Sequence, residues 1–143
     1  MITDNLKNIA DELSMFDDAL EKYEYIIEIG SQNFDFDESY KSDKYLVSGC
    51  SSSVWLYCTK VDDKLFFHSD SNAMIAKGLA SIICKIYSGN SSKEILNSDT
   101  KLLENLNLSE IITPVRQNGV ASIQSYILKF AKDYEDECLR KSY

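Results

Sequence analysis

Cys50 is the residue whose surroundings most favour reactive chemistry. It interrupts an apolar run and is flanked by Gly49 and by serines at 51–53, which bring hydrogen-bonding groups in place of packing side chains. Gly49 permits a turn that a residue with a β-carbon resists, so we expect Cys50 at a bend. A thiol there, beside free backbone N–H groups, has a route to a lowered pKa and an accessible sulfur. An inert core thiol is the alternative that these residues leave open.

The elements that must position this thiol are predicted by hydrophobic spacing. Apolar residues three and four apart predict a helical hairpin over about 4–30, with Asp17 or Asp18 capping its second helix and Gly30 ending it in the left-handed conformation. A sheet is expected over about 44–69, with the Cys50 turn after its first strand. The three expected antiparallel strands are 44–47, 53–61 and 64–69.

Helices are expected over about 71–138, after the sheet. A long helix over about 72–87 should pack against the sheet, and Gly78 within it indicates close approach to another element. Thr113-Pro114 should break the chain before Arg116, and a last helix should follow Asn118-Gly119. The predicted fold class is α+β, with a small three-stranded antiparallel sheet packed on helices.

Length and composition limit the class of protein. The 143 residues are 44% hydrophobic and suffice for a single domain over 1–143 with its own core. A formal net charge of -8 argues against a nucleic-acid partner, since phosphate binding draws on clustered Lys and Arg. No apolar run approaches the ~18 residues of a membrane span, and the amino terminus is polar and acidic. We therefore expect a cytoplasmic protein that does not bind membranes.

The four cysteines are expected to be free thiols, because a chain of this length needs no disulfide framework. Cys58 and Cys84 should face the core, and Cys138 should be exposed. No two cysteines have the spacing of a zinc or cluster knuckle, so no metal site is predicted. His68, the only histidine, is placed at a strand end, where it would act as a general base if it lay near Cys50.

Four stretches in order carry a resemblance to a known family. Residues 49–55, Gly-Cys-Ser-Ser-Ser-Val-Trp, resemble the Gly-Cys-Gln-Ser-x-Val-Trp signature of the SufE-like family, the sulfur acceptors of iron-sulfur cluster assembly. The other three stretches are 23–30, 70–79 and 113–120, and the resemblance covers roughly residues 10 to 130. The chain departs from the family pattern at Ser51, Asn72 and Val115, where Gln, Asp and Ser are usual.

The resemblance implies a function for Cys50 and partners for the protein. Cys50 would take persulfide sulfur from a SufS-like cysteine desulfurase, which carries the pyridoxal phosphate, and pass it to a SufB-type scaffold complex. The protein would stimulate the desulfurase without being a stand-alone enzyme. It would need no cofactor or metal of its own. The resemblance is also compatible with a homodimer. The implied fold is SufE/IscU-like.

The resemblance also implies candidate residues for partner docking or for stabilising the sulfur. A guanidinium at Arg116, near the sulfur or at the docking surface, would stabilise the anion or the complex. A surface or helix-capping arginine is the alternative. The remaining candidates are Gly49, Ser51, Asp70, Lys77 and Gly78, of which Gly78 is expected to serve packing first.

Three other functions stay open at this point. A thiol hydrolase would pair Cys50 with His68 and act alone on small substrates. An iron-sulfur scaffold would need three grouped cysteines, and this chain is expected to place only one at the loop. An interaction domain in which Cys50 is incidental would tolerate Cys50→Ser.

Overall fold

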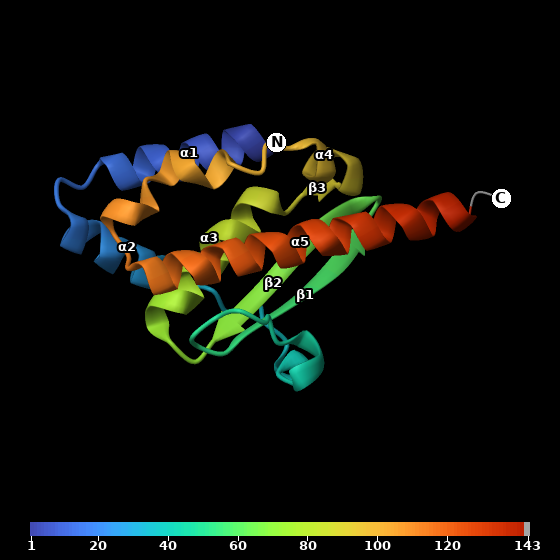
Figure 1. Ribbon diagram of the computed structural model, residues 1–143, viewed down its shortest axis with the longest axis horizontal. Helices are drawn as coiled ribbons and strands as arrows, with labels where there is room; N and C mark the ends of the chain where they lie inside the picture. Colours follow the sequence, from blue (N-terminus) through green and yellow to red (C-terminus); the bar gives the residue numbers. More distant parts are fainter. Residues whose placement is uncertain (142–143) are drawn as a thin grey trace.

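A three-stranded antiparallel sheet forms one side of the fold, and the helices gather on the other side (Figure 1). The computed structural model describes residues 1–141; the last two residues of the expected 1–143 domain lie outside the described part. The strands lie in the order β1-β2-β3 and are β1 (Val54–Val61), β2 (Lys64–Ser71) and β3 (Asn90–Ser91). The architecture is α+β, as predicted.

The hairpin of β1 and β2 turns at Asp62 and Asp63, as predicted. Both residues have positive φ, 50° and 64°, which is the backbone of the tight two-residue turns that match strand twist. The register pairs Tyr57 with His68. Directly paired residues point to the same face of a sheet, so His68 lies on the same face as Tyr57.

The helical hairpin is confirmed with shifted ends. Its helices are α1 (Ile2–Ser14) and α2 (Ala19–Ser31). Asp18 caps α2, accepting a hydrogen bond from the Glu21 N–H at 2.8 Å. The prediction that Gly30 ends this helix in the left-handed conformation is wrong, because α2 continues through Ser31.

Gly30 and Gly78 instead allow two helices to touch. Gly78 lies in α3 (Met74–Tyr87), and a β-carbon there would lie 2.1 Å from the Ile26 carbonyl oxygen of α2. A β-carbon on Gly30 would lie 2.6 Å from the backbone nitrogen of Gly78. The close approach predicted for Gly78 is therefore its contact with α2.

The strand predicted at 44–47 is wrong. Residues Asp43–Tyr45 form a short 3₁₀ helix, η2, and only a single bridge joins Leu46 to Trp55. The Tyr45 ring packs edge-on against Tyr40, 4.8 Å between ring centres, so this segment curls around aromatic rings in place of extending. The sheet is three-stranded because β3 pairs with the start of β2.

The helices after the sheet form a cover on one face. The helix α3 packs most closely on the sheet, as predicted. It is followed by α4 (Ser92–Asn97) and α5 (Pro114–Lys141), joined through the 3₁₀ turns η3 (Leu102–Leu106) and η4 (Leu108–Glu110). The chain does break at Thr113, but the prediction that the last helix follows Asn118-Gly119 is wrong, because Pro114 is already the first residue of α5, a position where its missing N–H costs nothing. Arg116 and Gly119 consequently belong to the first turns of a helix that crosses the sheet (Figure 1).

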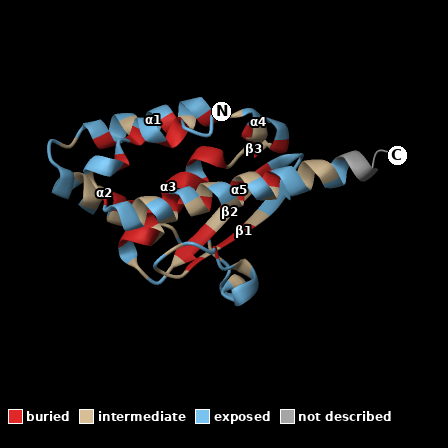
Figure 2. Cartoon of the chain, viewed as in Figure 1, coloured by how far each residue is buried: buried red, intermediate tan, exposed pale blue. Residues whose placement is uncertain are grey.

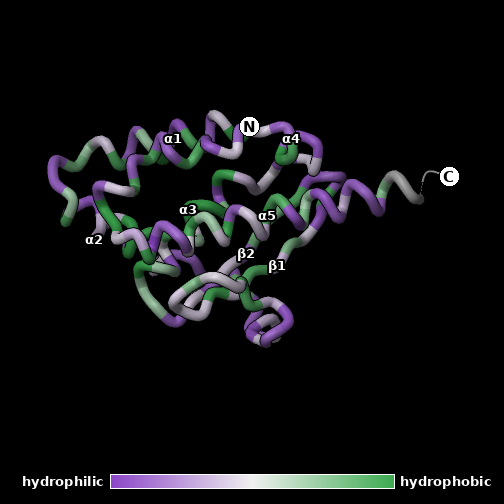
Figure 3. Tube along the Cα trace, in the orientation of Figure 1, coloured by the Kyte–Doolittle hydropathy of each residue, from purple (hydrophilic) through white to green (hydrophobic). Residues whose placement is uncertain are grey.

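The core lies between the sheet and its helical cover. Figure 2 shows α3 almost entirely buried, while α1 turns a single buried stripe inward. Figure 3 shows the same division by residue type, with apolar α3 beneath mixed α5. Fully buried members include Ile26, Leu56, Leu65, Ile83 and Ile127. Within residues 1–141, none of the helices combines the length and apolar character needed to cross a bilayer.

Candidate functional site

The thiol loop comprises residues 47–53 and leads into β1. Gly49 adopts φ +92°, a conformation that residues with a side chain rarely take. A β-carbon at Gly49 would also lie 2.4 Å from Ser122 Oγ of α5. The predicted bend is confirmed, and it needs glycine for both conformation and space.

Both ends of the thiol loop are fixed by hydrogen bonds. The Val47 N–H donates to the Val54 carbonyl at 2.8 Å. At the other end Ser53 donates its N–H to Asn72 Oδ1 at 3.1 Å, and its carbonyl accepts from the Ser71 hydroxyl at 2.7 Å. The central residues of the loop therefore lie between two ends that are held by hydrogen bonds.

The Cys50 thiol points inward, toward the start of α5. It is half-buried, and its Sγ lies 3.7 Å from the Gly119 carbonyl oxygen, to which it donates. Beneath it lies a cavity of about 20 Å³, enough for roughly one water-sized group. The cavity is lined mainly by apolar side chains, among them Val54, Ala76, Leu79, Val120 and Ile123.

Burial raises the pKa of the Cys50 thiol above its ordinary value. The expected route to a lowered pKa is therefore wrong for this position of the loop. A desolvated sulfur that donates to a carbonyl oxygen favours the neutral thiol over the thiolate. In this position burial and the Gly119 carbonyl oxygen hold the Cys50 thiol in its neutral form.

Arg116 reaches the thiol loop from the first turn of α5. Its Nη1 donates to Ser52 Oγ at 2.9 Å, and the residue lines the Cys50 cavity. The guanidinium therefore contacts the loop two residues from the sulfur. Ser51 is exposed and lines the same cavity.

The remaining candidates serve the scaffold around the loop. Gly78 is buried in the contact with α2, so it offers no docking surface. Asp70 is only 8% exposed and pairs with two ammonium groups: Lys41 Nζ at 2.9 Å and Lys77 Nζ at 3.6 Å. Burial opposes ionisation of Asp70, but the hydrogen bonds from Lys41 and from the Ser71 N–H prevail and hold its pKa below the usual value.

Several residues of the site have no counterpart in the sequence-based prediction. Ser122 and Gly119 lie far from Cys50 in sequence, and only the fold brings them to the loop. Lys41 contacts Asp70, which lies beside the turn that anchors the loop. Lys41 does carry one signal. It is the first cation after the acidic stretch of residues 35–38, so the sequence alone predicts an ion pair with an acidic side chain.

His68 does not pair with Cys50. Its Nδ1 lies 3.2 Å from Asp35 Oδ2, its Nε2 lies 2.9 Å from Thr59 Oγ1, and its ring stacks on Tyr57. The histidine lines a separate groove of about 630 Å³ between α2, α3 and β2. Both ring nitrogens are thus engaged elsewhere, so the geometry gives no support to the proposed thiol hydrolase pair.

The other cysteines do not join Cys50 at its cavity. Cys84 is buried in α3, Cys58 is half-buried in β1 and Cys138 is exposed; all are free thiols. Cys58 is therefore less buried than predicted, since β1 becomes exposed toward its end. In the part of the chain that the structure describes, no three His, Cys, Asp or Glu side chains group as metal ligands would.

Together the fold and the site define an α+β protein with a half-buried thiol on an anchored loop at one end of its sheet. A family model for SufE, the Fe-S metabolism associated domain, matches residues 7–131. The chain is 38% identical over 114 residues to a cysteine desulfuration protein SufE from Wigglesworthia glossinidia brevipalpis, covering 78% of this chain and 79% of that one. It therefore belongs to the SufE family.

Two further proteins are similar to this chain, one in sequence and one in fold. An uncharacterized SufE-like protein from Rhizobium etli is 32% identical over 133 residues, 90% of each chain. The solution structure of a hypothetical protein from Thermus thermophilus superposes with a TM-score of 0.73, covering 90% of this chain and 94% of that one. At 14% identity, that structure supports the fold alone.

Proposed function

We propose that Cys50 accepts a sulfur atom from the persulfide of a SufS-like cysteine desulfurase and passes it to a SufB-type scaffold complex. The observation that carries this proposal is the position of Cys50 in a SufE-family chain, on an anchored loop above a cavity of about one water's size. The protein acts as a partner of the desulfurase and not as a stand-alone enzyme. Pyridoxal phosphate stays with the desulfurase.

The transfer is a displacement at sulfur. The Cys50 thiolate attacks the outer sulfur of the desulfurase persulfide, a new S–S bond forms on Cys50, and the desulfurase cysteine leaves as a thiolate. The Cys50 proton goes to solvent or to a base of the partner before the attack. No net oxidation occurs, because the sulfane sulfur and its oxidation state move together from one cysteine to the other.

In this proposal the loop moves between the inward position of the structure and an outward one, and the two positions suit the two needs of a carrier. Outward, the thiol on its Gly49 bend reaches a partner's active site and can ionise in water. Inward, the apolar side chains around the cavity keep reductants from a persulfide, and the cavity has space on the scale of the added atom. Four free cysteines suit a reducing compartment, and we include the cytoplasm in the proposal.

The test is the stimulation of a SufS-like desulfurase. With cysteine as substrate, the wild-type protein should raise the rate of alanine formation, Cys50→Ser should not, and the matched variant Cys138→Ser should act like wild type. Stimulation that survives Cys50→Ser would contradict the proposal. Hydrolysis of small thioesters by the protein alone, lost in Cys50→Ser, would favour the hydrolase alternative.

A further inference from the structure

Lys41 lies at the centre of a charge cluster on the outer face of the sheet. Its Nζ is 2.9 Å from Asp70 Oδ2 and 3.0 Å from Glu38 Oε2, and it lies 5.7 Å from the centre of the Trp55 ring. Lys77 of α3 is the second ammonium group on Asp70, at 3.6 Å. The cluster thus ties three segments together: the connector before the thiol loop, β2 and α3.

Asp70 needs these cations because it is a carboxylate with little access to water. A buried charge without a partner carries a large desolvation cost, and the Lys41 contact is the shorter of the two. The Asp70 carboxylate also accepts from the Ser71 N–H at 2.8 Å. The carboxylate is therefore bonded to the residue at which β2 ends and the turn into α3 begins.

That turn holds one end of the thiol loop. The Ser71 hydroxyl donates to the Ser53 carbonyl at 2.7 Å and accepts from the Ala73 N–H at 3.2 Å. Asn72 adds two bonds to Ser53, one from its N–H at 3.3 Å and one to its Oδ1 at 3.1 Å. A continuous series of bonded groups runs from Lys41 through Asp70 and Ser71 to Ser53, three residues from Cys50.

We propose that Lys41 is a positioning residue for Cys50, which acts by holding Asp70 and, through Asp70, the turn at 71–73 that anchors the thiol loop. This inference rests on the proposed function of Cys50 in sulfur transfer. Without the Lys41 charge, Asp70 turns toward Lys77 and water, and the bonds on Ser53 lengthen. The thiol loop then opens more often while the core beneath it stays intact.

The first test measures alkylation of the free protein by iodoacetamide, resolved by cysteine. Lys41→Met removes the ammonium group, including its contact with the Trp55 ring, and keeps an apolar stem of similar length. We expect Cys50 to react roughly five-fold faster, the factor that corresponds to the net loss of one ordinary hydrogen bond, because Lys77 and water replace part of the Lys41 contact. Exposed Cys138 and buried Cys84 should keep their wild-type rates, because Cys84 reacts only on larger opening.

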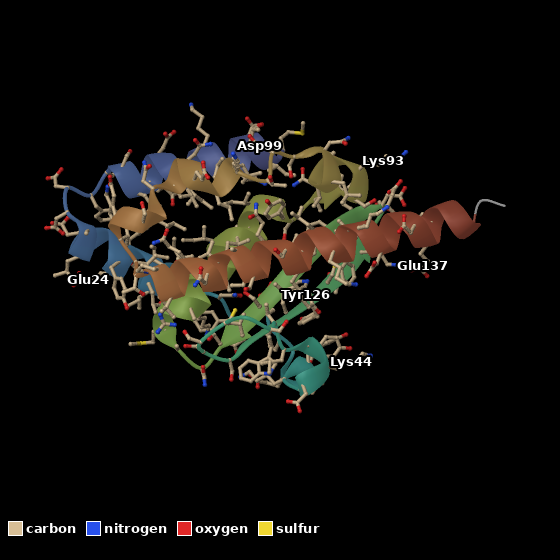
Figure 4. All side chains as sticks on the ribbon, in the orientation of Figure 1. Glu24, Lys44, Lys93, Asp99, Tyr126 and Glu137 are labelled. Carbon is tan, nitrogen blue, oxygen red and sulfur yellow. The ribbon has the colours of Figure 1, made fainter. Side chains whose placement is uncertain are left out.

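Two variants supply the controls. Lys41→Arg keeps the charge and should restore the wild-type rate at Cys50. Lys44→Met removes another cation of the same connector. The Lys44 side chain lies on the outer side of the connector, over the Tyr45 ring (Figure 4). This variant should leave the alkylation rate of Cys50 unchanged. Equal rates at Cys50 in wild type and Lys41→Met would overturn the proposal. So would a rise at Cys84 in step with Cys50, which would mark Lys41 as merely structural.

The second test measures sulfur transfer from a SufS-like desulfurase with cysteine. Lys41→Met should lower kcat/KM for the acceptor roughly five-fold, with recovery in Lys41→Arg, because a loop without its anchor opens more often but seldom holds Cys50 in the orientation that attack on the persulfide requires. Unchanged kcat/KM in Lys41→Met would overturn the inference. If wild type itself accepts no sulfur, the proposed function fails, and the alkylation pattern still decides whether Lys41 positions the loop.

Discussion

The thiol of Cys50 donates a hydrogen bond to the carbonyl oxygen of Gly119, 3.7 Å away in the second turn of α5. This contact joins the loop at the end of the sheet to the helix that covers the sheet. Burial raises the pKa of the Cys50 thiol above its ordinary value. The carbonyl oxygen acts in the same direction, because it accepts from a neutral S–H group and repels a thiolate.

The pH dependence of alkylation should report this setting. Burial raises the pKa of Cys50, so its iodoacetamide rate in the folded protein should reach half its maximum at a higher pH than in the chain unfolded by urea. A folded midpoint at or below the unfolded one would show that the thiol is activated before any partner binds.

The same shift predicts the sign of a stability change. A thiol whose pKa is raised on folding stabilises the protein fully below its unfolded pKa and loses that contribution as pH rises through the folded value. Burial also raises the pKa of Cys84, to about 12. The free energy of unfolding should therefore fall as pH rises from about 9 toward 12, and Cys84→Ala should flatten the decline.

Gly49→Ala should destabilise the thiol loop. The positive φ alone costs about 1–2 kcal/mol for a residue with a side chain, and the new β-carbon meets Ser122 Oγ. Urea unfolding should show a loss of about 2 kcal/mol. In the double variant with Ser122→Gly the contact is gone but the strained φ remains, so only part of the loss should be recovered. Full recovery would show that φ carries no cost here.

Gly78→Ala and Gly119→Ala form a matched pair of helix substitutions. At Gly78 the new β-carbon lies against backbone of α2, which cannot swing away, and the cost should be about 3 kcal/mol. At Gly119 the nearest atom is Cys50 Sγ at 3.8 Å, an ordinary contact, so this variant should gain up to about 1 kcal/mol. Equal effects in urea unfolding would contradict the tight contact between α2 and α3.

Arg116→Ala should weaken sulfur transfer by releasing Ser52. The loss of one hydrogen bond of about 1 kcal/mol corresponds to roughly a five-fold fall in kcat/KM for the acceptor. Arg116→Lys keeps the charge but loses the fixed fork of the guanidinium, so it should recover only part of the activity. Unchanged kinetics in Arg116→Ala at subsaturating acceptor would remove Arg116 from the site.

The sequence predicts those features that depend on local chemistry. The bend at Cys50 follows from Gly49 and its serine neighbours, the cap at Asp18 from side-chain chemistry, and the hairpin turn from Asp62 and Asp63. Each needs only a few consecutive residues to specify it. The resemblance to the SufE family adds the prediction that Cys50 accepts sulfur. The donor and the recipient of that sulfur are proposals.

The features that the sequence does not predict depend on distant partners. Residues 44–47 have the composition of a strand, but the packing of Tyr45 on Tyr40 curls them into a 3₁₀ turn. Pro114 is ambiguous, because proline both breaks helices and begins them. The raised pKa of Cys50 comes from burial against apolar residues of α3 and α5. Residues 47–53 alone do not specify that burial.

The most direct test of the account is the intact mass of the protein after incubation with a SufS-like desulfurase and cysteine. The account predicts a gain of one sulfur atom, located on Cys50 by fragmentation, present in Cys138→Ser and absent in a folded Cys50→Ser variant. A gain that persists in Cys50→Ser, or that maps to Cys138, would contradict it.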